Sequence, residues 1–248
     1  MAKQNIYDND RFFENFKSIR ENSINFNELL ETPILNRMMP NIKNKTVLDI
    51  GCGMGHHAKQ YADAGATYVL GIDLSENMLA YAREHYSAKN IEYRQMAMED
   101  MNQITQKFDV VTSSLVFDYV EDFYDMMKKV RSCLKNDGVF VFSMSHPIDT
   151  AYDGTYERYT RSEENERLYA NVRNYGIEGK RVIHWEVDDY ELYHHTFSTI
   201  VNAMIKAGLQ IEECQESTAT QELLNKYPGI FEGTLHQPNF IFFRCTCA

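Results

Sequence analysis

From residue 45 onward, short apolar runs alternate with segments that repeat their apolar residues at helical spacing. The runs that predict strands are Thr46–Ile50, Tyr68–Ile72, Ile91–Met96, Phe108–Ser113, Val139–Ser143, Leu209–Cys214 and Asn239–Cys245. The helical segments are 57–64, 75–86, 121–134 and 195–207, and Ser75 is the predicted N-cap of the second. Because strands that alternate with helices at this spacing form βαβ units, the pattern predicts an α/β fold: a mostly parallel, seven-stranded sheet flanked by helices.

Two stretches fall outside this rhythm. Residues 1–44 show no strong strand pattern, and the apolar residues of Asn25–Met39, interrupted by Pro33, predict two short helices. Residues 149–189 are rich in Tyr, Asn, Glu and Arg, and a structureless loop of that length is unusual inside a compact domain. We therefore predict an N-terminal helical cover (1–44), a core (45–147 and 191–248) and an inserted lid after the fifth strand (148–190).

The first predicted strand runs directly into a glycine-rich turn. The segment Val47–Gly55 reads VLDIGCGMG, with Gly51, Gly53 and Gly55 at alternate positions. Without a Cβ, glycine lets the backbone turn tightly and approach a ligand at the carboxyl edge of the sheet. Asp73 ends the second strand, about 20 residues further on, where it can accept hydrogen bonds from both hydroxyls of a ribose. Dinucleotide sites and adenosyl-cofactor sites share this pairing.

The glycine spacing favours one of these two cofactor classes. A dinucleotide fingerprint of the form G-x-G-x-x-G needs glycine at position 56, where this chain has His56, followed by His57. The two histidines also crowd the helix N-terminus on which a pyrophosphate would sit. A nicotinamide-dependent oxidoreductase is therefore the weaker alternative.

Charge narrows the expected partners. The chain of 248 residues has 36 acidic and 25 basic side chains, a formal net charge of −11. A field of this sign repels phosphate backbones and anionic membranes, so we expect a small-molecule substrate and neither nucleic acid nor a membrane. The composition is that of an ordinary globular domain, and we expect a monomer or a weak homodimer.

The cysteines and the terminal segment bear on the compartment. The five cysteines have no framework spacing, the N-terminal residues are polar from the start, and no apolar run approaches the ~18 residues of a membrane span. We expect a cytoplasmic protein with reduced thiols. Cys245 and Cys247 have the spacing of half a metal site, but no His or Cys cluster completes it, so we predict no metal.

Four segments of the core resemble the motifs of one enzyme family. VLDIGCGMG at 47–55, GIDLSENMLAYARE at 71–84, MEDM at 98–101 and FDVVTSSLVFDYVED at 108–122 resemble class I S-adenosylmethionine-dependent methyltransferases, which have a Rossmann-like fold. Three further runs resemble a bacterial subgroup that acts on small molecules: VFSMSHPI at 141–148, YHHTF at 193–197 and QPNFIFF at 237–243. The resemblance implies S-adenosylmethionine as the cofactor and methyl transfer to O or N of a metabolite by in-line displacement.

The resemblance also implies cofactor contacts at matching positions. The implied cofactor-binding residues are Asp49, Gly51, Gly53, Gly55, Asp73, Leu74, Met78, Met98, Glu99 and Ser114. The three glycines would pass the methionine part of the cofactor, with Asp49 near its ammonium group. Asp73 would hold the ribose hydroxyls.

The adenine contacts depart from the family pattern. Leu74 and Met78 would flank the adenine ring. Family members often have an aspartate where Ala97 stands, and they use it on the adenine amine. In this chain that contact would fall to the Met98 backbone and to Glu99.

The acceptor is expected at the carboxyl ends of the fourth and fifth strands, beneath the insertion. Methyl transfer from a sulfonium needs alignment, desolvation and at times a base, so no catalytic triad is expected. The fourth strand lacks the Asn/Asp-Pro-Pro-aromatic segment that enzymes methylating nucleobases usually carry. Asp118 stands where the family often has His. It either binds an acceptor amine or acts as a base, or it caps the helix that starts near Val120.

Two histidine positions are further catalytic candidates. His146 follows the fifth strand, and either belongs to the site or orders the start of the insertion. His194 and His195 would point about 100° apart on a helix, so at most one faces the pocket. We take His195 as the candidate, and the alternative is a hydrogen bond to the lid backbone.

Residues of the insertion and of the N-terminal cover complete the expectations. Trp185 and the insertion tyrosines, Tyr190 among them, either form an aromatic wall suited to a flat or cationic acceptor or pack inside the lid. Tyr7 lies in a segment resembling those that close over the cofactor, and Arg20 is a candidate to bind a carboxylate. The sequence thus predicts a methyltransferase, with a non-enzymatic adenosyl-cofactor-binding protein as a further alternative.

Overall fold

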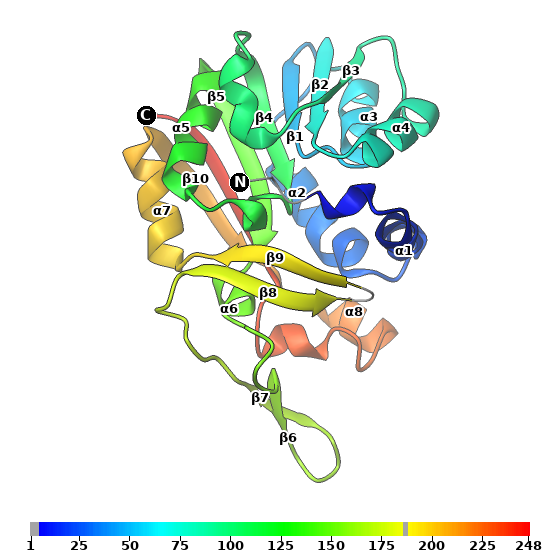
Figure 1. Ribbon diagram of the computed structural model, residues 1–248, viewed down its shortest axis with the longest axis vertical. Helices are drawn as coiled ribbons and strands as arrows, with labels where there is room; N and C mark the ends of the chain where they lie inside the picture. The colour runs from blue at the N-terminus through cyan, green and yellow to red at the C-terminus, as the bar shows by residue number, and fades with distance from the viewer. Residues whose placement is uncertain (1–4, 186–187) are drawn as a thin grey trace.

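The computed structural model describes residues 5–185 and 188–248. At its centre is a seven-stranded sheet of order β10-β11-β5-β4-β1-β2-β3 (Figure 1). The strands are β1 (Thr46–Ile50), β2 (Tyr68–Asp73), β3 (Ile91–Gln95), β4 (Phe108–Ser114), β5 (Leu134–Ser145), β10 (Leu209–Glu216) and β11 (Phe240–Cys247). Neighbouring strands are parallel except that β11 is antiparallel to β5 and to β10. The predicted mostly parallel α/β sheet is confirmed.

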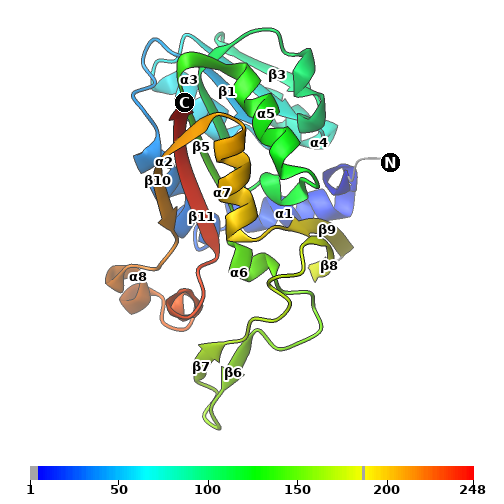
Figure 2. The same cartoon turned by 90° about the vertical axis from the view of Figure 1, so that its left-hand side faces the viewer.

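Helices cover both faces of this sheet. They are α1 (Asp10–Glu21), α2 (Thr32–Met38), α3 (His56–Asp63), α4 (Glu76–His85), α5 (Phe123–Cys133), α6 (Pro147–Thr150), α7 (Phe197–Lys206) and α8 (Gln221–Lys226). Short 3₁₀ or π turns are η1 (Ile6–Asp8), η2 (Asn27–Glu31), η3 (Met98–Gln103), η4 (Phe117–Tyr119) and η5 (Glu232–Leu235). Figure 2 shows α5 and α7 over one face. Buried residues of α2 and α3 pack on the other face.

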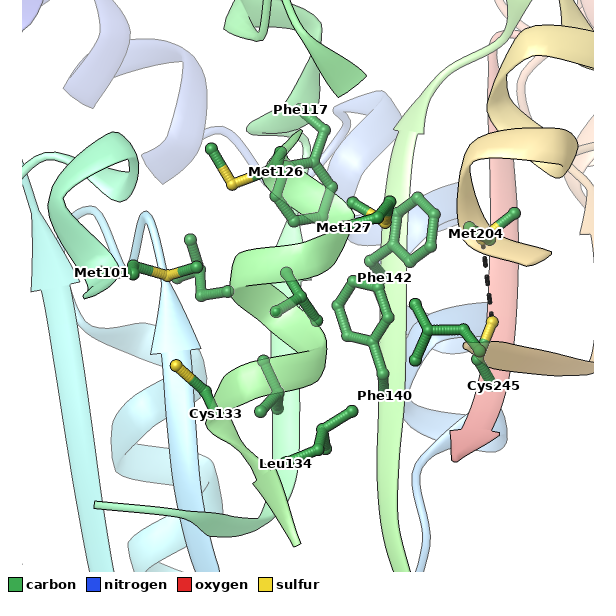
Figure 3. Packing of buried hydrophobic residues seen from close by; sticks show 14 of the residues in the cluster. Met101, Phe117, Met126, Met127, Cys133, Leu134, Phe140, Phe142, Met204 and Cys245 are labelled. Carbon is green, nitrogen blue, oxygen red and sulfur yellow. Dashed lines mark hydrogen bonds between the residues drawn. The ribbon is translucent and has the colours of Figure 1, made fainter. Parts of the chain in front are cut away.

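The largest core lies between the sheet and α5 and α7 (Figure 3). Phe140 and Phe142 of β5 stack with ring centroids 4.7 Å apart, and Phe117 of η4 packs edge-on against both. Met126 and Met127 bring α5 into the same cluster. Each of these side chains is at most 1% exposed, so the core fixes η4 firmly at the carboxyl end of β4.

Several element boundaries differ from the predicted ones because a side-chain cap decides where a helix begins. Ser75 caps α4 as expected, since its Oγ accepts a hydrogen bond from the Met78 N–H. Helix α5 begins at Phe123 because Asp122 is its cap, and α7 begins at Phe197 because Thr196 is its cap. The predicted turn at 136–138 falls within β5, where the pairing with β4 shifts register.

The segment after β5 folds into ordered elements outside the main sheet. It contains α6, a hairpin of β6 (Tyr159–Arg161) and β7 (Arg167–Ala170), and a hairpin of β8 (Gly179–Trp185) and β9 (Asp188–His194). The β6–β7 hairpin projects away from the body, whereas β8–β9 crosses the lower end of the sheet in Figure 1. Strand β9 contacts η4 and α6, and it runs past residue 191, where we expected the core to resume.

Candidate active site

The three glycines after β1 all have positive φ, but each serves a different need. A Cβ on Gly51 would lie 2.3 Å from a methyl of Val116, and one on Gly55 would lie 2.5 Å from the Tyr93 hydroxyl. A Cβ on Gly53 would have no atom within 4 Å. Gly51 and Gly55 are therefore required by packing, while Gly53 faces open space of the kind a ligand fills.

That open space belongs to a cavity of about 680 Å³, a volume typical of small-molecule sites. Its walls come from the glycine loop, the end of β2, η3, the end of β4, η4, the N-terminal segment and the β8–β9 hairpin. Of the predicted cofactor residues, it is lined by Gly51, Gly53, Asp73, Leu74, Met78, Met98, Glu99 and Ser114. Asp49 and Gly55 do not line it.

Asp73 is held rigidly at the wall of the cavity. Its Oδ2 accepts a hydrogen bond from the Gly53 N–H at 2.8 Å, and its Oδ1 accepts one from the Ser75 N–H at 2.9 Å. Burial raises the pKa of this carboxyl, and the backbone donors oppose that rise. Two backbone donors fix its orientation, and a carboxylate has further lone pairs with which to accept hydroxyl hydrogens.

Asp49 is buried beneath the glycine loop with an unsatisfied oxygen. Its side chain is 2% exposed, and its Oδ2 has no hydrogen-bond partner among the described residues. Burial, together with the nearby charges of Asp73 and Glu31, raises its pKa to about 7. Because buried polar atoms are nearly always paired, an orphaned carboxylate oxygen here fits a cationic ligand group such as the ammonium of the cofactor.

Glu31 is an acid that the sequence analysis missed. It lies in η2, fully buried, and its Oε1 accepts hydrogen bonds from Ser114 Oγ at 2.9 Å and Ser143 Oγ at 2.5 Å. It thereby ties the N-terminal cover to the ends of β4 and β5. Within the run NELLETPIL, only its position among apolar neighbours distinguishes Glu31 from a solvated helix acid.

Asp118 of η4 also lines the cavity. Its carboxylate accepts hydrogen bonds from the Ser145 N–H at 3.1 Å and the Ser145 Oγ at 2.7 Å. Burial, together with the nearby charge of Asp149, raises its pKa to about 6, and the hydrogen bonds from Ser145 oppose that rise. The alternative that Asp118 caps the following helix is wrong, because Asp122 caps α5.

Three tyrosines from distant segments line the same region: Tyr7 of η1, Tyr119 of η4 and Tyr190 of β9. The hydroxyls of Tyr7 and Tyr119 are 3.0 Å apart and hydrogen-bonded. Tyr119 was not singled out from the sequence. We call the part of the cavity lined by Tyr7, Asp118, Tyr119, Ser145 and Tyr190 the acceptor half, and the part lined by the predicted cofactor residues the cofactor half.

The N-terminal segment is fastened over the cavity by its own acid. Asp8 Oδ1 accepts hydrogen bonds from Ser75 Oγ at 2.6 Å and from the Asn77 N–H at 3.1 Å, at the start of α4. Carboxylates are stabilised at a helix N-terminus by the free N–H groups and the helix dipole. This contact holds the segment that carries Tyr7, whose phenol senses the charges of both Asp73 and Asp118.

The predicted histidines lie elsewhere. His146 does not line the cavity; its Nε2 is 2.8 Å from Glu216 Oε1, and its Nδ1 accepts from the Ile148 N–H. His195 is also outside, with its Nε2 2.7 Å from the Val120 carbonyl. His194 bonds to Thr150 and to the Tyr175 carbonyl. All three hold loops together, and the side chain of Trp185 lies outside the described residues.

Arg20 and His57 line the cavity near the N-terminal cover. Arg20 Nη2 is 3.7 Å from Glu28 Oε1, a long ion pair. The Nδ1 of His57 has no partner among the described residues, and burial together with Arg20 lowers its pKa to about 4, which keeps the ring neutral. A neutral imidazole and a weakly paired guanidinium suit an anionic group such as a carboxylate.

Comparison with known proteins shows which family shares this arrangement. The sequence profile of a methyltransferase domain matches residues 48–142, from β1 through most of β5. The solved structure of an S-adenosylmethionine-dependent methyltransferase from Mesorhizobium loti is 32% identical, with a TM-score of 0.78 over 87% of this chain and 96% of that one.

Two curated relatives carry more detailed names. A malonyl-[acyl-carrier protein] O-methyltransferase of Acetivibrio thermocellus is 33% identical over 75% of this chain and 73% of its own length. A ubiquinone biosynthesis O-methyltransferase of Actinobacillus pleuropneumoniae is 39% identical. The matched region covers 44% of this chain and 49% of that relative. No helix in the described ranges 5–185 and 188–248 is long and apolar enough to cross a membrane.

The fold, the glycine loop with Asp73 and the similarities to these methyltransferases agree with one another and exclude the nicotinamide alternative. The chain belongs to the class I S-adenosylmethionine-dependent methyltransferases, with S-adenosylmethionine as its cofactor.

Proposed function

We propose that this chain transfers the methyl group of S-adenosylmethionine to O or N of a small molecule held in the acceptor half. The observation that carries the proposal is the continuity of one cavity from Gly53 and Asp73 to Asp118 and Tyr190. A donor and an acceptor bound in one cavity can be aligned for in-line displacement. The N-terminal segment and β9 border the cavity on two sides, which favours a small molecule over a nucleic acid.

In the cofactor half we assign each contact to a side chain whose surroundings support it. Asp73 binds the ribose hydroxyls, and Leu74 and Met78 contact the adenine beside Met98 and Glu99. The orphaned Asp49 oxygen, which lies behind the cavity wall, reaches the ammonium group through a water molecule, and Arg20 pairs with the carboxylate of the methionine part. Ser114, whose hydroxyl is bonded to Glu31, acts by supporting the wall.

The cofactor supplies a methyl group already activated by a positively charged sulfur. The chain has three tasks besides binding it. Glu31 and Asp8 hold the N-terminal cover over the site, which excludes water. Tyr7, Tyr119 and Tyr190 orient the acceptor, and Asp118 accepts the proton that the acceptor loses.

We propose the domain limits 1–44, 45–147 with 191–248, and 148–190, and a monomer or weak homodimer acting in the cytoplasm without nucleic acid or membrane. All five cysteines are free, which supports a reducing compartment. Light scattering during gel filtration measures the oligomeric state directly.

The test is a transfer assay with S-adenosylmethionine carrying a labelled methyl group and a panel of phenols, carboxylic acids and amines. We expect label in at least one product, formation of S-adenosylhomocysteine, and loss of both in Asp73→Ala. Label in added DNA or RNA, or in none of the small molecules while a protein extract becomes labelled, would overturn the proposal of a small-molecule acceptor.

A further inference from the structure

The acceptor half contains a buried carboxylate without a counter-charge. Asp118 is 8% exposed, and its two oxygens accept hydrogen bonds from Ser145. No described Lys, Arg or His side chain forms an ion pair with it, and the charged group nearest in effect is another acid, Asp149. An isolated buried charge is costly, so such a carboxylate normally has a cationic partner.

The two lysines that line the cavity are engaged with other acids, and Arg20, the arginine of the lining, is assigned above to the carboxylate of the cofactor. Lys180 pairs with Glu191, and Lys129 pairs with Asp125 at 2.6 Å. Asp149 has its own partner, since Arg158 Nη1 lies 2.5 Å from its Oδ1. Within the described residues, Asp149 and the cavity acids Glu191 and Asp125 thus have basic partners, and no ion pair involves Asp118.

The groups that face Asp118 are hydrogen-bond acceptors as well. Burial raises the pKa of Tyr7, Tyr119 and Tyr190, and the charge of Asp118 adds to that rise, so the three phenols stay neutral. A neutral phenol oxygen has two lone pairs. The hydrogen bond between Tyr7 and Tyr119 occupies one lone pair of the accepting hydroxyl, so lone pairs on both oxygens stay available to a ligand. The Asp118 carboxylate and the phenol oxygens together can accept several N–H bonds, whereas the charge of Asp118 repels a carboxylate or phenolate.

We propose that the acceptor is a primary or secondary amine, which binds as its cation with the ammonium group on Asp118 and among the three phenols. This inference rests on the proposed function and chooses nitrogen over oxygen. The preference for nitrogen follows from the unpaired carboxylate at the wall of the cavity. The two relatives with more detailed names are O-methyltransferases by name.

The reaction then balances through Asp118. One proton passes from the ammonium nitrogen to the Asp118 carboxylate and frees the nitrogen lone pair. That lone pair forms the new N–C bond as the methyl C–S bond breaks and its electrons return to sulfur. The products are S-adenosylhomocysteine and a methylated ammonium ion, and Asp118 returns its proton to solvent when the product leaves.

A competing use for the carboxylate is to neutralise the sulfonium of the cofactor. The two uses differ in which ligand loses affinity when the charge is removed. If Asp118 serves the sulfonium, Asp118→Asn weakens S-adenosylmethionine relative to S-adenosylhomocysteine, which lacks that charge. If Asp118 serves the acceptor, the ratio of the two affinities stays constant.

The test measures binding to the full chain saturated with S-adenosylhomocysteine, by calorimetry and thermal shift. The probes are matched sets that differ only in the head group: benzylamine with benzyl alcohol and benzoate, phenethylamine with phenethyl alcohol and phenylacetate, and tyramine with tyrosol and hydroxyphenylacetate. In at least one set we expect the amine to bind at least about tenfold more tightly than its partners, as one charge-assisted hydrogen bond allows.

The variants connect that preference to Asp118. Asp118→Asn should abolish it while leaving S-adenosylhomocysteine affinity unchanged, and Ser145→Ala should weaken it by loosening the carboxylate. Asp137→Asn removes the same charge from an exposed position of β5 outside the cavity and should change nothing. Asp118→Asn is used only if its S-adenosylhomocysteine affinity shows that it folds, and Ser145→Ala then provides the independent check.

Three results would overturn the inference: no set in which the amine binds best, an unchanged preference in Asp118→Asn and Ser145→Ala, or a selective loss of S-adenosylmethionine affinity in Asp118→Asn. If any of these results is found while the wild-type protein binds S-adenosylhomocysteine and methylates an alcohol or an acid, the proposed function stands. Only the choice of nitrogen as the methylated atom then fails. Failure of the wild type to bind S-adenosylhomocysteine would overturn both.

Discussion

The two halves of the cavity are built in different ways. Apart from Ser114 of β4 and Arg20 of α1, the cofactor half comes from one stretch of chain, β1 to η3, in which each strand delivers a loop to the same sheet edge. The acceptor half gathers single residues from four places: Tyr7, Asp118 with Tyr119, Ser145 and Tyr190. A cofactor shared by a family can be held by a local motif, while an acceptor particular to one enzyme is held by side chains that tertiary packing brings together.

The central acid of each half shows the same difference. Asp73 is oriented by backbone N–H groups of Gly53 and Ser75, which belong to its own and the neighbouring loop. Asp118 is oriented by Ser145 at the end of another strand. The cofactor half is therefore expected to form with the sheet, whereas the acceptor half also depends on the docking of the N-terminal segment and of β9.

The largest expected effect of a single substitution lies in the cofactor half. Asp73→Ala removes the carboxylate that we assign to two ribose hydroxyls, and charge-assisted hydrogen bonds contribute about 1.5–3 kcal/mol each. We expect a loss of S-adenosylhomocysteine affinity of at least ~100-fold, measured by calorimetry. Asp137→Asn is the control for the loss of one negative charge. If Asp73→Ala bound S-adenosylhomocysteine within about threefold of wild type, the assignment of Asp73 to the ribose hydroxyls would be wrong.

A pair of glycine substitutions separates packing from ligand space within the glycine loop. Gly51→Ala should destabilise the fold by about 2–4 kcal/mol, because its Cβ meets Val116 and φ is +66°. Gly53→Ala, with open space at φ +50°, should cost about 1 kcal/mol but lower cofactor affinity. Urea unfolding with and without S-adenosylhomocysteine measures both quantities, and equal losses of stability would contradict the distinction.

Asp49→Asn should raise the free energy of unfolding above neutral pH and lower the affinity for the cofactor. Because burial raises the pKa of Asp49 to about 7, the folded state holds this proton more tightly than the unfolded chain does. The proton's stabilising contribution is complete below pH ~4 and is lost as pH rises through about 7.

Above that pH the Asn variant, which carries no charge to bury, should be more stable than the wild type by on the order of 2 kcal/mol. Its affinity for S-adenosylhomocysteine should fall about tenfold with the loss of an ammonium partner. Thermal unfolding between pH 5 and pH 9 gives the comparison, and a variant that is less stable than wild type at pH 8 would contradict this interpretation.

The smallest expected effects concern the histidines outside both halves. His146→Gln and His195→Gln should leave turnover within about threefold of wild type and should lower stability by about 1 kcal/mol, since each ring makes one or two structural hydrogen bonds. Steady-state kinetics with the acceptor found in the transfer assay, together with urea unfolding, provide the measurement. A loss of turnover above about 100-fold at unchanged stability would show that the substituted histidine takes part in catalysis.

Much of the cofactor half could be predicted because its signals are local. A β-branched run, three alternate glycines and an acid at the end of the next strand lie within 28 residues, 46–73. Ser75 was identified as a helix cap for the same reason. The histidines were misleading because position at a strand end does not determine where a ring points: His146 turns to Glu216 and His195 to the Val120 carbonyl.

By itself, the sequence determined the parallel sheet, the family and the cofactor, because periodicity and turn chemistry act between near neighbours along the chain. Only the tertiary structure decided the rest. It buried Glu31 against two strand ends, brought the Tyr7 hydroxyl to that of Tyr119, 112 positions away, and left Asp118 at the cavity without a counter-charge. Burial and pairing depend on what packs from distant segments, and no spacing in the sequence records that.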